Sequence, residues 1–103
     1  MGLTRLDLQA KLEEIIGSRN VYFQPPSNIV LKYPCVVYER STFDTSYADN
    51  VPYTVRGRYQ ITLIDENPDT PYLDSILALP RCRHERHYNS DGLNHDVCYM
   101  YTS

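Results

Sequence analysis

The sequence predicts a single α+β domain in which an N-terminal helix and a second short helix pack on a mainly antiparallel, four-stranded sheet. Two segments carry apolar residues at helical spacing, and each is followed by two segments of strand-like composition, in the order helix-β-β-helix-β-β. No repeat, linker or break in composition interrupts the 103 residues, a length that suits one domain with one modest core. We therefore expect one domain spanning residues 1–103.

The first helix is expected to begin at Thr4 and to end at Gly17. Thr4 and Asp7 have the spacing of a capping box, in which the hydroxyl accepts from a free helix N–H and the carboxylate complements the helix dipole. Glycine at position 17 provides a common helix stop. The apolar stripe that should pack on the sheet consists of Leu8, Leu12, Ile15 and Ile16.

The first two strands are expected at 34–40 and 53–64. The first is rich in β-branched and aromatic residues, and the second half of the other alternates apolar with polar residues. Residues 21–32 contain a double proline and are expected to be irregular. The polar segment 41–52 is expected to be a connection of about 12 residues, and connections of that length are often functional.

The second helix follows turn residues at 65–69. Thr70 can cap it and Pro71 can occupy its first position, so we expect a short helix through Leu79 that Pro80 ends. The side chains expected to face the sheet are Leu73, Ile76 and Leu77.

The last two strands are expected at 81–88 and 93–101. The residues between them, 89–92, are Asn, Ser, Asp and Gly, which tolerate turn geometry. The C-terminal part of the chain therefore predicts a hairpin.

The overall composition narrows the class of protein. The formal net charge of -3 argues against a protein that grips nucleic-acid phosphates by bulk electrostatics. Ten tyrosines fit either half-buried strands or contact surfaces. The odd set of Cys35, Cys82 and Cys98 favours a reducing cytosol over a disulfide scaffold, and no apolar run approaches the length of a membrane span.

Five metal-type donors gather in the C-terminal hairpin, namely Cys82, His84, His87, His95 and Cys98. Strict alternation in a strand places Cys82 and His84 on one face and His87 on the other, and it separates His95 from Cys98 in the same way. The spacing also matches no common zinc pattern. We therefore predict no metal site, with a zinc site as the alternative.

Catalytic groups are also not indicated. Cys82 or Cys98 could act as a nucleophile beside an imidazole, but neither follows a glycine-rich turn or a helix N-terminus that would activate a thiol. Asp65, Glu66 and Asp69 cluster where aspartate commonly bends the chain. We predict no catalytic residue and no cofactor.

One basic concentration occurs, at Arg81, Arg83 and Arg86. Glu85 interrupts it, and aspartates follow closely. A solvated strand face is expected here in preference to a nucleic-acid groove.

Several runs across most of the chain resemble small head-tail neck proteins of tailed bacteriophages, of the type found in phages and prophages of Gram-positive bacteria. The runs are VYFQPP (21–26), YPCVVY (33–38), ADN (48–50), RYQITLIDxNPD (58–69) and DxLNHDV (91–97). The order of helices and hairpins is similar to that of the tail terminator family.

The resemblance implies a non-enzymatic virion protein of the neck that assembles in the host cytoplasm. Its members would form a homo-oligomeric ring, expected to be a hexamer, on the head-proximal end of the tail tube. Such a ring would stop tube polymerisation, contact the tail-tube protein and the head-tail connector or stopper protein, and leave a channel through which DNA passes without specific binding. An adaptor or stopper position in the neck is the alternative within this class.

Subunit or partner contacts are expected in the long connection between the first two strands. The candidate residues are Tyr47, Asp49, Asn50 and Tyr53. Two hypotheses from other classes stay open, a small Cys/His metal-binding hydrolase and a monomeric host adaptor that binds one partner through a tyrosine-rich face.

Overall fold

The computed structural model describes residues 4–48 and 51–101, and for 42–48 and 51–56 it describes the backbone only. The α+β class is confirmed, with two helices and a five-stranded sheet in the described part of the chain. The elements are α1 (Arg5–Ile16), β1 (Val21–Phe23), β2 (Cys35–Ala48), β3 (Val51–Asp65), α2 (Tyr72–Leu77), β4 (Cys82–Ser90) and β5 (Leu93–Tyr101).

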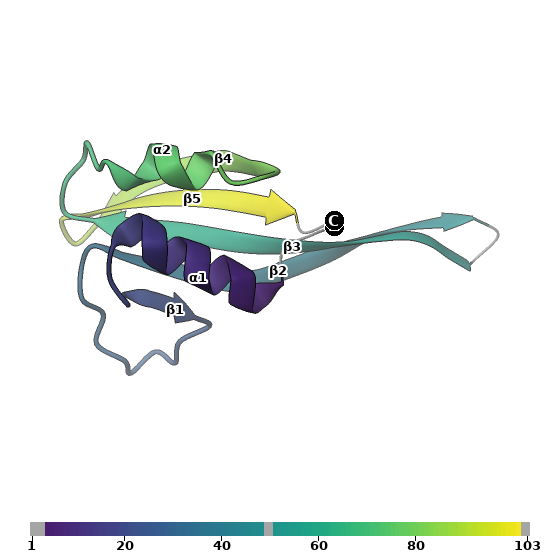
Figure 1. Ribbon diagram of the computed structural model, residues 1–103, viewed down its shortest axis with the longest axis horizontal. Helices are drawn as coiled ribbons and strands as arrows, with labels where there is room; N and C mark the ends of the chain where they lie inside the picture. The colour runs from purple at the N-terminus through teal and green to yellow at the C-terminus, as the bar shows by residue number, and fades with distance from the viewer. Residues whose placement is uncertain (1–3, 49–50, 102–103) are drawn as a thin grey trace.

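The sheet has the order β1-β2-β3-β5-β4 (Figure 1). All neighbouring strands are antiparallel except β1, which runs parallel to β2 and pairs Val21 with Val36. The expected four-stranded antiparallel sheet is therefore corrected to a mixed sheet of five strands. The expectation that 21–32 is wholly irregular was wrong, since residues 21–23 form a strand that pairs with β2. Three residues are too few to show the alternation by which a strand is recognised in a sequence.

Helix α1 has the predicted ends. The Thr4 hydroxyl accepts from the backbone N–H of Asp7, and the Asp7 carboxylate accepts from that of Thr4. Gly17 ends the helix with φ of 74°, in the left-handed region. Leu8, Leu12 and Ile16 are buried against the sheet.

Both helices pack on one face of the sheet, which we call the helix face. Tyr38, in the middle of β2, is fully buried there. Its phenol ring lies 5.0 Å from that of Phe23 and 6.0 Å from that of Tyr59, and its hydroxyl donates to the side-chain carbonyl of Gln9 on α1. These contacts join the helix to three strands.

The described helices include none that is long and apolar enough to cross a membrane.

The most prominent feature is a long two-stranded ribbon (Figure 1). Strands β2 and β3 pair from Cys35 and Ile64 out to Ala48 and Val51. The neighbouring strands stop much earlier, because β5 pairs with β3 only over 58–65 and β1 with β2 only over 36–38. Residues 42–57, here named the β-ribbon, therefore have no other described strand beside them.

The β-ribbon corrects the expectation of a polar loop at 41–52. Threonine, tyrosine, phenylalanine and valine are frequent in 42–55, and their strand propensity prevails over the interspersed serine and aspartate residues. Two irregularities in the pairing, between Arg40 and Phe43 and between Ser46 and Tyr47, absorb the mismatch in register. The chain consequently extends 49 Å along its longest axis against 25 Å along the other two.

Helix α2 is shorter than expected. It begins one residue later, with Pro71 at the N-cap, and it ends at Leu77, not at Leu79. The Thr70 hydroxyl accepts weakly from the backbone N–H of Tyr72, at 3.4 Å. Ile76 is buried, and its neighbours Leu73 and Leu77 pack on the same core, as predicted.

The C-terminal hairpin is confirmed, with a tighter turn than expected. Strand β4 continues to Ser90, and only Asp91 and Gly92 form the turn. Both have positive φ, 53° and 76°, as a two-residue type I′ turn requires.

Candidate functional site

A β-bulge in β4 brings two histidines together. The pairing with β5 shifts by one residue between His84 and Arg86, so Glu85 is the additional residue. The bulge cancels the alternation expected from sequence, and His84 and His87 both lie on the helix face beside Asp96 of β5. The prediction that His84 and His87 point to opposite faces was therefore wrong.

The carboxylate of Asp96 lies between the two imidazoles. Its Oδ1 atom is 3.2 Å from Nε2 of His84 and 2.9 Å from Nδ1 of His87. Asp96 is only 4% exposed, whereas the side chains of His84 and His87 are 36% and 44% exposed. Because an ionised carboxylate only accepts hydrogen bonds, both imidazoles must donate to it, which fixes the tautomer of each when neutral. The two imidazoles thus provide hydrogen bonds to a carboxylate that is buried on the helix face of the sheet.

The two cysteines of the hairpin lie on the same face. Cys98 is fully buried and Cys82 is half-buried. The hydrogen bond from the Cys98 thiol lowers the pKa of Cys82, and this bond, burial and the nearby charges raise the pKa of Cys98. Cys82 is therefore the more readily ionised member of the pair, and Cys98 is the inert one.

His95 does not join this group. It lies on the opposite face of the sheet, here named the far face, where its ring stacks on Tyr88 at 4.6 Å and its Nδ1 is 3.2 Å from the carbonyl of Leu93. The five cysteine and histidine residues of the hairpin thus do not converge. Within the described part of the chain, no group of three His, Cys, Asp or Glu residues is placed to hold a metal ion.

The acidic residues that follow β3 form a turn. The carboxylate of Asp65 accepts from the backbone N–H of Asn67, and the side-chain amide of Asn94 donates to the carbonyls of Asp65 and Glu66. These contacts tie the turn to β5. Burial, together with the charge of Asp65, raises the pKa of the Cys35 thiol to about 12, so this thiol remains protonated near neutral pH.

Two of the three clustered arginines, Arg83 and Arg86, lie on the far face, opposite Tyr99 and Val97 of β5. Both are exposed, and the guanidinium of Arg86 lies 5.6 Å from the centre of the Tyr88 ring. Arg81 instead lies before β4 with φ of 57°. These positions agree with the expected solvated strand face.

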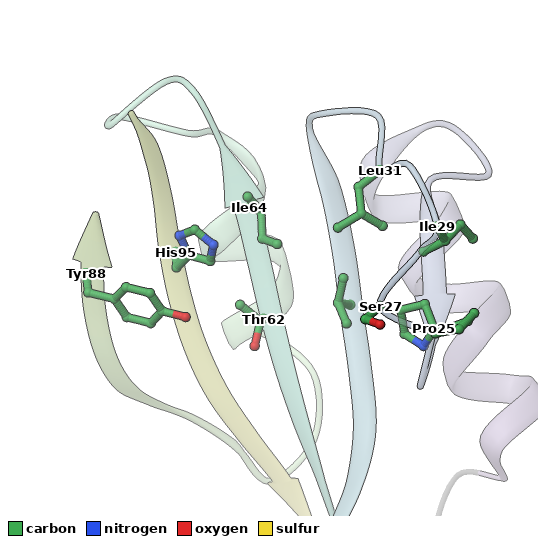
Figure 2. Close-up of a pocket in the computed structure, with 10 residues that line it drawn as sticks. Pro25, Ser27, Ile29, Leu31, Thr62, Ile64, Tyr88 and His95 are labelled. Carbon is green, nitrogen blue, oxygen red and sulfur yellow. The ribbon is translucent and has the colours of Figure 1, made fainter. Parts of the chain in front are cut away.

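The far face also carries a groove, which the sequence did not indicate (Figure 2). One wall is the segment before β2, the other is the stacked pair Tyr88 and His95, and strands β2 and β3 form the floor. Its volume is about 360 Å³. The lining consists of Pro25, Pro26, Ser27, Ile29, Leu31, Val37, Thr62, Ile64, Tyr88 and His95. The double proline and the apolar residues after it were the available signal, but only the fold brings them beside β4.

Two of the four candidate contact residues, Tyr47 and Tyr53, belong to the β-ribbon. Tyr47 lies in β2 and Tyr53 in β3, and the structure describes only the backbone of these two residues. Asp49 and Asn50 lie outside the described residues. The backbone therefore places Tyr47 and Tyr53 in the outer part of the β-ribbon, far from the His84, His87 and Asp96 cluster.

Comparison with known proteins adds no relative: the chain matches no protein-family model and no curated protein. The likeness to phage neck proteins therefore rests on the five sequence runs given above.

Proposed function

We propose that the chain is a structural subunit of the head-tail neck of a tailed phage and acts as a tail terminator. Its copies form a ring, hexameric by the resemblance, on the head-proximal end of the tail tube. The ring ends tube polymerisation, contacts the head-tail connector and leaves a channel for DNA. The protein works by assembly in the virion and carries no catalytic role.

The β-ribbon is the observation that supports this proposal. A two-stranded ribbon without a third strand is marginally stable in water, and its free edges favour pairing with another chain. Each strand of the β-ribbon has about seven residues, which span roughly 23 Å. Such a projection costs conformational entropy that a contact with another subunit or with the tail tube would offset. A monomeric adaptor has no comparable need for it.

The contact residues are proposed to be Tyr47, Asp49, Asn50 and Tyr53, because tyrosine provides a large apolar surface with a polar tip and is enriched at interfaces. Changing Tyr47 and Tyr53 together to serine should weaken ring assembly roughly tenfold or more. Native mass spectrometry and mass photometry of the ring would measure this. Tyr33→Ser, at an exposed tyrosine outside the β-ribbon, is the matched control. An unchanged ring in the double variant would reject these contacts.

Depleting the chain in the phage that encodes it tests the role itself. Without a terminator, tail-tube subunits should continue to add, and electron microscopy should show overlong tubes without heads. Without a stopper or adaptor, tubes should have normal length and remain unjoined. Normal virions would contradict any essential neck function.

A further inference from the structure

Three side chains of the C-terminal hairpin that carry sulfur lie on the helix face of the sheet. Cys82 of β4 is directly opposite Met100 of β5, and Cys98 precedes Met100 by two residues, so the three side chains point to the same side. Cys98 and Met100 belong to the buried core, and Cys82 packs against it. A methionine thioether is a metal ligand as well as an apolar group, so the hairpin places three sulfur donors side by side.

The two thiols of this group contact each other. The Cys98 thiol donates a hydrogen bond to the sulfur of Cys82, and both cysteines are free. Two thiols that share a proton in this way hold their sulfur atoms on either side of it. A metal cation that replaces the proton would therefore meet sulfur on both sides.

The register of the hairpin disfavours a disulfide between these thiols. Cys82 pairs with Met100 and Cys98 pairs with His84, so the two cysteines are diagonal neighbours. Diagonal positions of an antiparallel pair have Cα atoms about 7–8 Å apart, whereas a disulfide usually needs about 4.4–6.8 Å. A bridging metal ion separates two sulfur atoms by up to about 4.6 Å, which is twice a metal–sulfur bond of about 2.3 Å. The ion can therefore span the wider separation.

The donor set selects a soft metal ion. Structural zinc is bound by four ligands, which are cysteine, histidine or carboxylate side chains. The described part of the chain brings no three such residues together, and the imidazole of His84, opposite Cys98, contacts Asp96. Two thiolates and a thioether instead suit copper(I), which prefers sulfur and accepts a low coordination number.

The surroundings favour a cation that arrives from the edge of the sheet. Asp96 precedes Cys98 by two residues on the same face, and its negative charge acts on the Cys98 thiol and would stabilise a bound cation. Cys82 is half-buried on β4, the outermost strand, so an ion reaches its first ligand without opening the core. Helix α2 packs on β4 and helps to cover the deeper ligands (Figure 1).

We propose that Cys82, Cys98 and Met100 form a binding site for one copper(I) ion, with the two thiolates as the principal ligands and the thioether as the third. On binding, the ion displaces the thiol protons to solvent, because a coordinating thiol is deprotonated. The site lies in the body of the domain and not on the β-ribbon, so it does not depend on the proposed ring function.

Anaerobic titration with copper(I) tests the proposal. The full chain competes for the ion with a chromophoric copper(I) chelator, and near-ultraviolet absorption reports the formation of copper–thiolate bonds. The wild type should bind one ion per chain. Cys82→Ser and Cys98→Ser should each weaken binding about 100-fold or more, and Met100→Leu, which nearly conserves the side-chain volume, should weaken it about tenfold.

Cys35→Ala is the matched control, because Cys35 is a buried free thiol of β2 outside the hairpin. It should bind copper(I) like the wild type, and circular dichroism should verify the fold of every variant. Cys82→Ser changes a half-buried residue of an edge strand, so this variant should fold even if Cys98→Ser does not. Equal affinity in Cys82→Ser and the wild type, or a loss of equal size in Cys35→Ala, would overturn the proposal.

Two further measurements separate this site from its alternatives. X-ray absorption of the loaded protein should show copper(I) with sulfur ligands only, whereas stoichiometric zinc that excludes copper(I) would reject the assignment. Diamide should leave both thiols of the metal-free protein reduced. A loss of two hydrogen atoms per chain, with Cys82 and Cys98 joined, would show a redox pair in place of a metal site.

Discussion

The stability of the hairpin should depend on two histidines acting through one buried carboxylate. We consider His84→Ala, His87→Ala and the double variant. Each single change removes one hydrogen bond to Asp96 and leaves the other. The double change leaves a carboxylate that is 4% exposed without either imidazole.

The expected magnitudes follow from this difference. A hydrogen bond to a charged group contributes about 1.5–3 kcal/mol, and the partial exposure of both imidazoles reduces this to about 1 kcal/mol for each single variant. Stranding a buried charge costs more than the loss of its separate bonds, so the double variant should lose about 3 kcal/mol. For a domain of this size, each kcal/mol lowers the melting temperature by about 4–8 °C.

Urea unfolding at pH 7.5, followed by circular dichroism, would measure the four free energies of the cycle. His95→Ala on the far face is the control, and its effect should add to that of His84→Ala because the two side chains share no partner. Additive losses in the His84 and His87 cycle, with a total below about 1 kcal/mol, would refute the reasoning. They would mean that water, and not the imidazoles, compensates Asp96.

Three further changes test local features of the fold. Gly17→Ala should cost about 1 kcal/mol in thermal unfolding, because its φ of 74° strains any side chain although an added Cβ would meet no atom within 4 Å. In the native protein at pH 8, a maleimide should modify Cys82 well before Cys98 or Cys35, as peptide mass spectrometry would show, and equal rates would contradict the burial of the other two. Because the folded state keeps the Cys35 thiol protonated while the unfolded chain ionises near pH 9, stability should fall as pH rises from about 9 towards 12, by at most about 1.4 kcal/mol per pH unit. In the Cys35→Ala variant, the free energy of unfolding, measured by urea unfolding at each pH, should fall less steeply over that range than in the wild type. Equal slopes in the two proteins would argue against the raised pKa of Cys35.

Local chemistry was sufficient to predict several elements. Thr4, Asp7 and Gly17 mark the ends of α1, and each acts through atoms no more than four residues away in sequence. The alternation in the second half of β3 and the Asp91-Gly92 turn likewise predicted the core strands and the last hairpin. A capping residue, a period or a turn can be recognised in a sequence because its physical cause is contained within a few residues.

The remaining features depend on strands that are distant in sequence. Val21–Phe23 becomes a strand only because β2 lies beside it, and residues 42–57 become a ribbon because β2 and β3 stay in register beyond their neighbours. The extra residue at Glu85 shows its effect only against β5, where it turns His87 towards Asp96.

Sequence by itself therefore determined the α+β class, the ends of α1 and the order of the main elements. The tertiary structure alone decided which side chains of β4 share a face and where the groove lies. A shift of one residue in register moves the following side chains to the other face, and both the shift in β4 and the pairing of β1 with β2 depend on strands outside the local sequence.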